Sequence, residues 1–123
     1  MGDRSVIGFK ADKDAVPVFL YAHWGGSDRY KDAQRAIEAA RPRWNDHAYA
    51  TRIGISQIVE NYWSEGLGFG ISAGHNSFSH PDYDDVILIT WDGRTVDIVS
   101  AGDSTVVKQT MSFDMFLTIT IMS

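Results

Sequence analysis

The chain has 123 residues, of which 44% are hydrophobic and 22% charged, and its formal net charge at pH 7 is −5. This composition is typical of one globular domain, and we expect a single domain over residues 1–123 with its core at about 5–100. The negative net charge argues against general nucleic-acid binding, which needs a basic face. The absence of cysteine excludes disulfide bridges, thiolate metal sites and thiol nucleophiles.

The N-terminal segment Met1–Arg4 lacks the apolar core of a secretory signal. The longest apolar runs are far shorter than the roughly 20 residues that span a bilayer. We therefore expect a cytoplasmic protein that does not enter a membrane.

In chain order, the first expected elements are strands over Ser5–Lys10 and Val16–His23, joined by a short polar loop. A helix should follow from a cap at 27–28 to about Ala40, because apolar residues recur there at three- and four-residue spacing. A second helix is expected from a cap at 45–46 to about Trp63.

Three more strands complete the core. One lies within residues 66–73, and the next two, Asp85–Thr90 and Thr95–Ser100, flank Asp92-Gly93, a strong hairpin signal. The order β-β-α-α-β-β-β predicts an α+β fold, a mostly antiparallel sheet with two helices packed on one face.

The C-terminal segment 101–123 permits two interpretations. Thr105–Gln109 forms another strand, after which Ser112 caps a short helix over Phe113–Leu117, or Met115–Met122 forms a final strand. Because this segment is apolar, we expect it to be an edge strand or an interface element, and we expect a homo-oligomer.

The stretch Tyr21-Ala22-His23-Trp24-Gly25-Gly26 ends an apolar strand and precedes a helix. Glycine lets backbone N–H groups approach a ligand closely, and a helix N-terminus attracts anions. His23 either contacts phosphate or acts as a general acid or base, or it is a hydrogen-bonded core residue. Trp24 either stacks on a base or fills the core.

A second group of candidates surrounds the start of the second helix. Arginines beside aromatic side chains suit a phosphate or carboxylate ligand, although a capping aspartate and internal arginine salt bridges explain each residue as well or better. The complete predicted ligand site comprises Tyr21, His23, Trp24, Gly25, Gly26, Arg43, Trp44, Asp46, Tyr49 and Arg52. If the protein is an enzyme, His23 and Asp46 are the catalytic candidates.

The loop around His75, His80 and Asp82 contains imidazole and carboxylate groups, but their spacing matches no metal-ligand motif. Nucleotide-binding and hydrolase motifs are also absent from the sequence. We therefore expect neither a metal nor another cofactor.

The motifs Tyr-x-His-Trp-Gly-Gly at 21–26, Arg-Trp-x-Asp at 43–46 and Gly-Phe-Gly-Ile-Ser at 68–72 occur together. In this order they resemble a family of small, largely uncharacterised proteins encoded by bacteriophages of actinobacteria and other hosts. The resemblance covers roughly residues 5–100. It implies a phage origin and a site location, but no particular reaction.

These observations predict a non-catalytic phage accessory protein that binds a small anionic, nucleotide-like ligand and sequesters a defence signal in the infected bacterial host. Two alternatives stay open. One is an enzyme that cleaves a nucleotide phosphodiester with His23, and the other is a protein-binding inhibitor of a host factor.

Overall fold

The computed structural model describes residues 5–22, 28–60, 68–74, 85–100 and 106–119. The strands of this part are β1 (Ser5–Lys10), β2 (Val18–Ala22), β3 (Phe69–Ala73), β4 (Val86–Thr90), β5 (Thr95–Val99) and β6 (Val107–Ser112). The helices are α1 (Arg29–Ala39), the 3-10 turn η2 (Arg41–Arg43), α2 (His47–Val59) and α3 (Phe113–Leu117).

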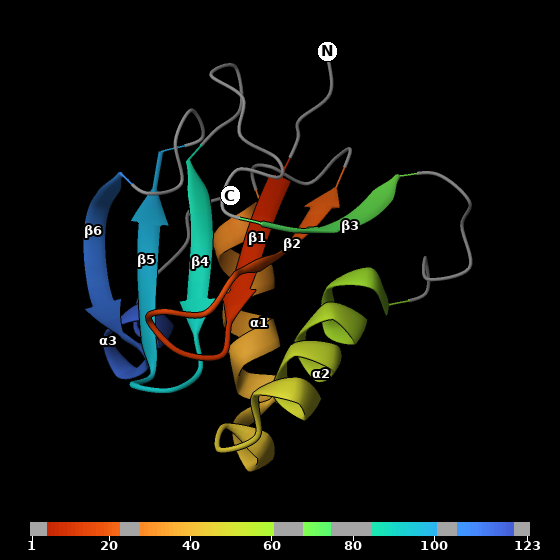
Figure 1. The fold of residues 1–123 in the computed structure, drawn as a ribbon. Helices are drawn as coiled ribbons and strands as arrows, with labels where there is room; N and C mark the ends of the chain where they lie inside the picture. Colours follow the sequence, from red (N-terminus) through yellow and green to blue (C-terminus); the bar gives the residue numbers. More distant parts are fainter. Residues whose placement is uncertain (1–4, 23–27, 61–67, 75–84, 101–105, 120–123) are drawn as a thin grey trace.

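The strands form one six-stranded sheet in the order β3-β2-β1-β4-β5-β6 (Figure 1). It consists of two antiparallel meanders, β1-β2-β3 and β4-β5-β6, joined where β1 and β4 pair in parallel. The predicted α+β class and the mostly antiparallel sheet are therefore confirmed. The parallel pairing in the middle of the sheet was not predicted.

The C-terminal segment adds β6 and α3 to the predicted order and thus follows the first of its two interpretations. Ser112 caps α3, since its hydroxyl oxygen accepts a hydrogen bond from the backbone N–H of Met115 at 3.1 Å. The apolar side chains Phe113 and Phe116 are buried in the core, whereas Met115 is exposed. β6 itself lies at an edge of the sheet.

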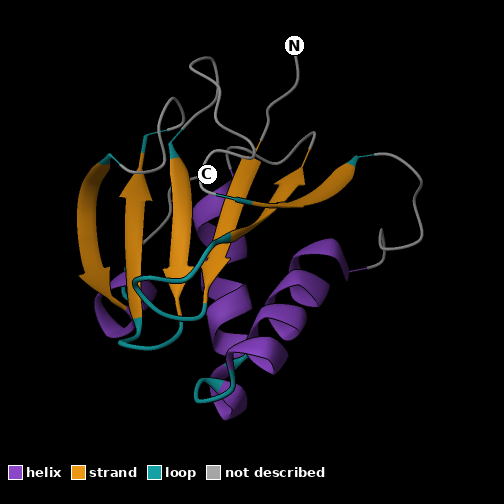
Figure 2. Cartoon of the chain, viewed as in Figure 1, coloured by secondary structure: helices purple, strands orange, loops and turns teal. Residues whose placement is uncertain are grey.

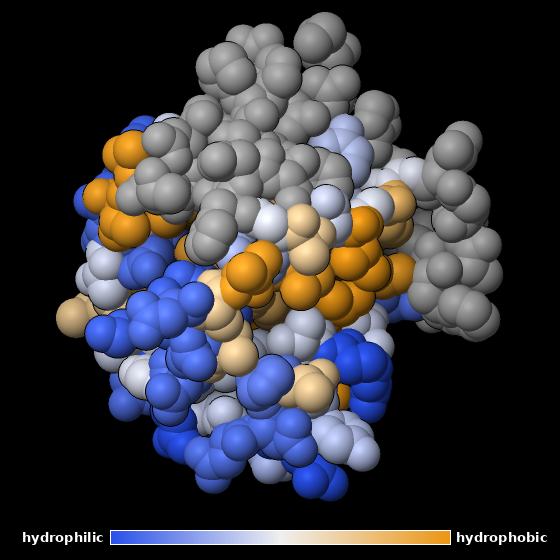
Figure 3. Space-filling model, in the orientation of Figure 1, coloured by the Kyte–Doolittle hydropathy of each residue, from blue (hydrophilic) through white to orange (hydrophobic). Residues whose placement is uncertain are grey.

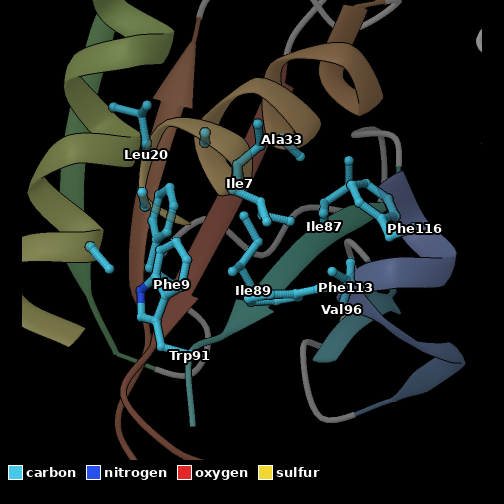
Figure 4. Packing of buried hydrophobic residues seen from close by; sticks show 14 of the residues in the cluster. Ile7, Phe9, Leu20, Ala33, Ile87, Ile89, Trp91, Val96, Phe113 and Phe116 are labelled. Atoms are coloured by element: carbon cyan, nitrogen blue, oxygen red, sulfur yellow. The ribbon is translucent and has the colours of Figure 1, made fainter. Parts of the chain in front are cut away.

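All three helices lie on one face of the sheet (Figure 2). The main core lies between the two layers and has large aromatic side chains at its centre (Figure 4). Trp91 is 1% exposed and stacks on Phe9 with a 6.1 Å separation between ring centroids. The rings of Phe113 and Trp91 are in edge-on contact, with 5.8 Å between their centroids. Through this contact α3 packs against the residue that follows β4.

The second helix starts and ends at identifiable residues. Asp46 is its N-cap, and the Asp46 carboxylate accepts from the N–H of Tyr49 at 3.4 Å. The helix ends before Glu60, whose φ of 51° breaks the helical pattern earlier than the predicted end near Trp63. Gly54 brings α2 close to the core, because a Cβ there would lie 3.1 Å from the ring of Phe9.

The opposite face of the sheet, called the front face below, is turned toward the viewer in Figure 1. Its apolar residues form a smaller buried cluster: Val6, Phe19, Val86, Leu88 and Val99, with Tyr21 packed against them. No helix of the described part is long and apolar enough to cross a membrane.

Candidate functional site

The segments that follow β1 and β4 come together because these strands are parallel. The backbone N–H of Trp91 donates to the carbonyl of Lys10 at 3.0 Å, and that of Asp92 donates to the carbonyl of Ala11 at 2.9 Å. Beyond these hydrogen bonds the two segments diverge. The segment after β1 leads to β2, and the segment after β4 leads to β5, on the other side of the β1–β4 pair. In open sheets, such divergence beyond the carboxyl ends of parallel strands creates a crevice for a ligand.

A polar pocket of about 400 Å³ lies beyond these strand ends and is called the turn pocket below. It is formed where the β1–β2 loop, the β4–β5 turn and the start of α2 meet. Its lining residues are Ala11, Asp12, Trp44, Asn45, His47, Trp91, Asp92, Gly93 and Arg94.

Two buried indoles form the inner wall of the turn pocket. The indole N–H of Trp91 donates to the hydroxyl of Thr51 on α2 at 2.9 Å, and that of Trp44 donates to the carbonyl of Ile37 at 2.9 Å. Phe113 contacts the Trp44 ring edge-on at 5.0 Å. Both rings are therefore fixed by hydrogen bonds and by packing, which makes the wall rigid.

Arg94 supplies the positive charge of the turn pocket. Its guanidinium donates to the side-chain oxygen of Asn45 at 2.8 Å and lies over the Trp44 ring at 5.3 Å from the centroid. The residue follows Gly93 in the β4–β5 turn, where both have positive φ, 83° for Gly93 and 54° for Arg94. The tight turn thus directs the arginine back toward the start of α2.

Carboxylates and an imidazole complete the polar surface. Asp12 and Asp92 follow β1 and β4, and one oxygen of Asp12 accepts from the N–H of Asp14 at 2.8 Å. His47 is the first residue of α2. Within the described ranges, no three histidine or acidic side chains gather in a way that would hold a metal ion. The lining of the pocket therefore offers both hydrogen-bond donors and carboxylate acceptors.

The structure describes only part of the predicted ligand site around the Tyr-x-His-Trp-Gly-Gly motif. Tyr21 lies on the front face of β2 beside the apolar cluster and pairs with Val6. It is near the end of β2, whereas the turn pocket is at the opposite end of the sheet (Figure 1). His23, Trp24, Gly25 and Gly26 lie outside the described residues, so their part of the site stays a prediction.

The other predicted residues lie in three kinds of environment: the core, the N-cap of α2 and the solvent-exposed surface. Trp44 is 9% exposed and lines the turn pocket, while Asp46 caps α2. Tyr49 is 54% exposed, and the guanidinium of Arg43 lies 5.1 Å from its ring centroid. Arg52 is also exposed and donates to the Ser56 hydroxyl at 3.4 Å.

Helical spacing separates this arginine group from the turn pocket. His47 and Thr51 are four residues apart and therefore share the face of α2 that is turned toward Trp91. Tyr49 and Arg52 share the solvent-exposed face of the same helix. The structure thus brings Trp44 to the pocket but leaves the group Arg43, Tyr49 and Arg52 outside it.

Asn45, His47 and Arg94 are not among the ligand-binding residues predicted from the sequence, although all three line the turn pocket. From the sequence, position 45 was expected only as part of a helix cap. The sequence does contain a pattern that could have indicated the pocket: β1 and β4 are each followed within two residues by an aspartate, Asp12 and Asp92. Comparison with protein-family models, curated proteins and solved structures gives no match for this chain.

Proposed function

We propose that the protein is a non-catalytic binding protein for a small anionic ligand of the nucleotide class, and that the turn pocket receives it. The observation that carries this proposal is the convergence of Arg94, Asn45 and His47 with two carboxylates around one 400 Å³ cavity. A cavity of this size lies within the range of small-molecule sites, and its buried indoles and converging polar groups could fix the orientation of a ligand.

The phosphate of such a ligand would contact Arg94. A guanidinium binds phosphate oxygens through paired hydrogen bonds, and here it is already oriented by Asn45 and by the Trp44 ring. His47 also lines the pocket, and its imidazole can donate a further hydrogen bond.

The carboxylates restrict the ligand further. Asp12 and Asp92 would repel a long polyphosphate chain, whereas they would accept hydrogen bonds from ribose hydroxyls or a base amino group. The pocket therefore favours a compact nucleotide with one anionic end and several hydrogen-bond donors at the other.

The biological setting follows from the resemblance to phage proteins. A phage accessory protein that binds a nucleotide tightly without altering it would lower the free concentration of a host defence signal in the cytoplasm. Association of copies through the edge strand β6 is compatible with this role, and size-exclusion chromatography tests it.

The proposal is tested by thermal unfolding against mono-, di- and cyclic nucleotides. A ligand at about 100 times its Kd stabilises the native state by about 2.7 kcal/mol, which corresponds to a Tm increase of roughly 10 °C. Replacing Arg94 with Gln should raise the Kd about 10- to 100-fold, because a charge-assisted hydrogen bond is lost.

Arg52→Gln is the matched control. It removes the same charge from the solvent face of α2 and should leave the Kd within about twofold of the unmodified protein, since such surface changes have small effects. Equal losses from both substitutions would place the ligand elsewhere. No stabilisation by any nucleotide would contradict the proposal and favour a partner-binding inhibitor.

His47 is a second candidate, besides His23, for the enzymatic alternative. Its imidazole shares the turn pocket with Asp12 and Asp92, and imidazole and carboxylate groups are common general acids and bases. Chromatography of the bound nucleotide separates the two functions. Recovery of an altered nucleotide, abolished by His47→Ala, would make the protein an enzyme.

A further inference from the structure

A second concavity, of about 810 Å³, lies on the front face and is called the front pocket below. Its floor consists of residues from the carboxyl halves of β1 and β4 and from the facing part of β5. The β1–β2 connection runs across this end of the sheet (Figure 1). The ammonium group of Lys10 donates to the carbonyl of Lys13 at 2.8 Å and so ties this loop to the floor.

The floor of the front pocket is built from hydroxyl and carboxylate groups. Thr90 is 4% exposed, and it faces Thr95 directly across the β4–β5 pairing. One carboxylate oxygen of Asp97 accepts from the hydroxyl of Thr110 on β6 at 2.6 Å, which fixes the carboxylate on the sheet. Rigid acceptors on a sheet surface suit a ligand that presents several hydroxyl groups.

The two pockets are neighbours. Asp12, Asp92 and Gly93 line both of them, so the β4–β5 turn is their common border. There is open space at Gly93, because a Cβ built there would have no atom within 4 Å. A ligand that extends along this turn would therefore meet no side chain at Gly93.

The two pockets differ in the number and kind of their charged groups. In the front pocket the carboxylates outnumber the ammonium groups, since Lys10 and Lys13 are set against Asp12, Asp14, Asp92 and Asp97. A second phosphate group would be repelled there, whereas sugar hydroxyls would find acceptors. The turn pocket has only the two carboxylates that both pockets share, and its guanidinium, that of Arg94, is oriented by Asn45.

From this arrangement we infer that the ligand is a nucleotide joined to a sugar, with its phosphates at Arg94 and its terminal sugar in the front pocket. The inference rests on the proposed function of the turn pocket and adds the class of ligand. Asp97 and Thr95 would accept or exchange hydrogen bonds with the hydroxyl groups of the sugar.

Two matched pairs of compounds test the inference by titration calorimetry: UDP with UDP-glucose, and ADP with ADP-ribose. Within at least one pair, the compound with the extra sugar should bind about tenfold more tightly, as expected for one or two additional hydrogen bonds. Asp97→Asn should remove this advantage and leave the diphosphate Kd unchanged, because asparagine preserves the bond to Thr110 but loses the charge. Glu60→Gln is the control and should change neither value, because Glu60 is exposed and lies at the end of α2 away from the turn pocket.

The outcomes separate the inference from the proposal on which it depends. If a diphosphate binds and is weakened by Arg94→Gln, but the added sugar gives no advantage, the front pocket is not part of the site and the inference fails alone. An advantage that survives Asp97→Asn also overturns it. If neither pair binds, the proposed nucleotide site fails together with the inference.

Discussion

The two ends of the parallel pair β1–β4 differ sharply on the front face of the sheet. At the amino ends, Val6 and Val86 are buried in an apolar cluster with Phe19. At the carboxyl ends, the same face presents Lys10 and Thr90 to a polar pocket. Figure 3 shows hydrophilic residues gathered over the lower part of this face.

The change occurs within two residues along each strand. Leu88 and Thr90 point to the same side of β4, yet the first closes the apolar cluster and the second lines the front pocket. The apolar end is closely packed and holds the strands in register, so the polar end can leave space open for a ligand. We call the amino ends of β1 and β4, with Val6 and Val86, the structural end of the sheet. The carboxyl ends, with Lys10 and Thr90, are its binding end.

The largest expected effect is a loss of stability when a side chain that packs against the binding end is removed. Phe113→Ala removes a buried ring that contacts both Trp44 and Trp91, and should lower the free energy of unfolding by about 3–5 kcal/mol. Met115→Ala, in the same helix but 61% exposed, should cost far less. Denaturant unfolding measures both, and a similar loss from the two variants would contradict the assigned role of Phe113.

The structural end should be the more sensitive to added volume. A Cβ at Gly8 would lie 2.6 Å from a methyl group of Leu88 and 2.7 Å from the ring of Phe19. Gly8→Ala should therefore destabilise the protein by about 1–3 kcal/mol, despite the entropic advantage of alanine. The nucleotide Kd of the folded variant should be unchanged. A higher Kd, measured where the variant is fully folded, would contradict the proposed division between the two ends.

A smaller effect is expected from Asp32, in the first turn of α1. Burial raises the pKa of this carboxyl from 3.8 to about 6, while the Arg35 guanidinium opposes the shift and Asp28 and Glu60 add to it. The folded state therefore binds the proton more tightly than the unfolded state. The stabilising contribution is complete below pH 4 and is lost as the pH rises through 6.

Asp32→Asn should consequently increase stability above pH 7, by on the order of 1–2 kcal/mol, and flatten its dependence between pH 4 and 7. Asparagine retains an acceptor for the hydrogen bond from Arg35, which is 3.2 Å in the native protein. Thermal unfolding across this pH range is the measurement. An unchanged pH profile would show that Asp32 does not hold its proton in the folded state.

Much of the fold could be predicted because local signals decide it. Asp92-Gly93 specifies the β4–β5 hairpin, and Ser112 specifies the start of α3. The parallel pairing of β1 and β4 has no such signal, because it joins segments about 80 residues apart without a turn between them. Hydrophobic patterns identify both strands but do not determine which strands become neighbours.

The site was harder to predict for the same reason. Asp12, His47 and Arg94 come from three separate segments and meet only after β1 has paired with β4. The sequence drew attention instead to arginines beside aromatic residues, such as Arg43 and Tyr49. That group does form a contact, but on the solvent face of α2.

The most direct test of the binding end is an amide chemical-shift map, recorded while UDP or ADP is added to the labelled protein. The account predicts the largest changes at residues 10–12, 45–47 and 91–94, with no more than small changes at Gly8 and Val86. Changes confined to Arg43, Tyr49 and Arg52, or the absence of changes at 91–94 in a saturated complex, would contradict it.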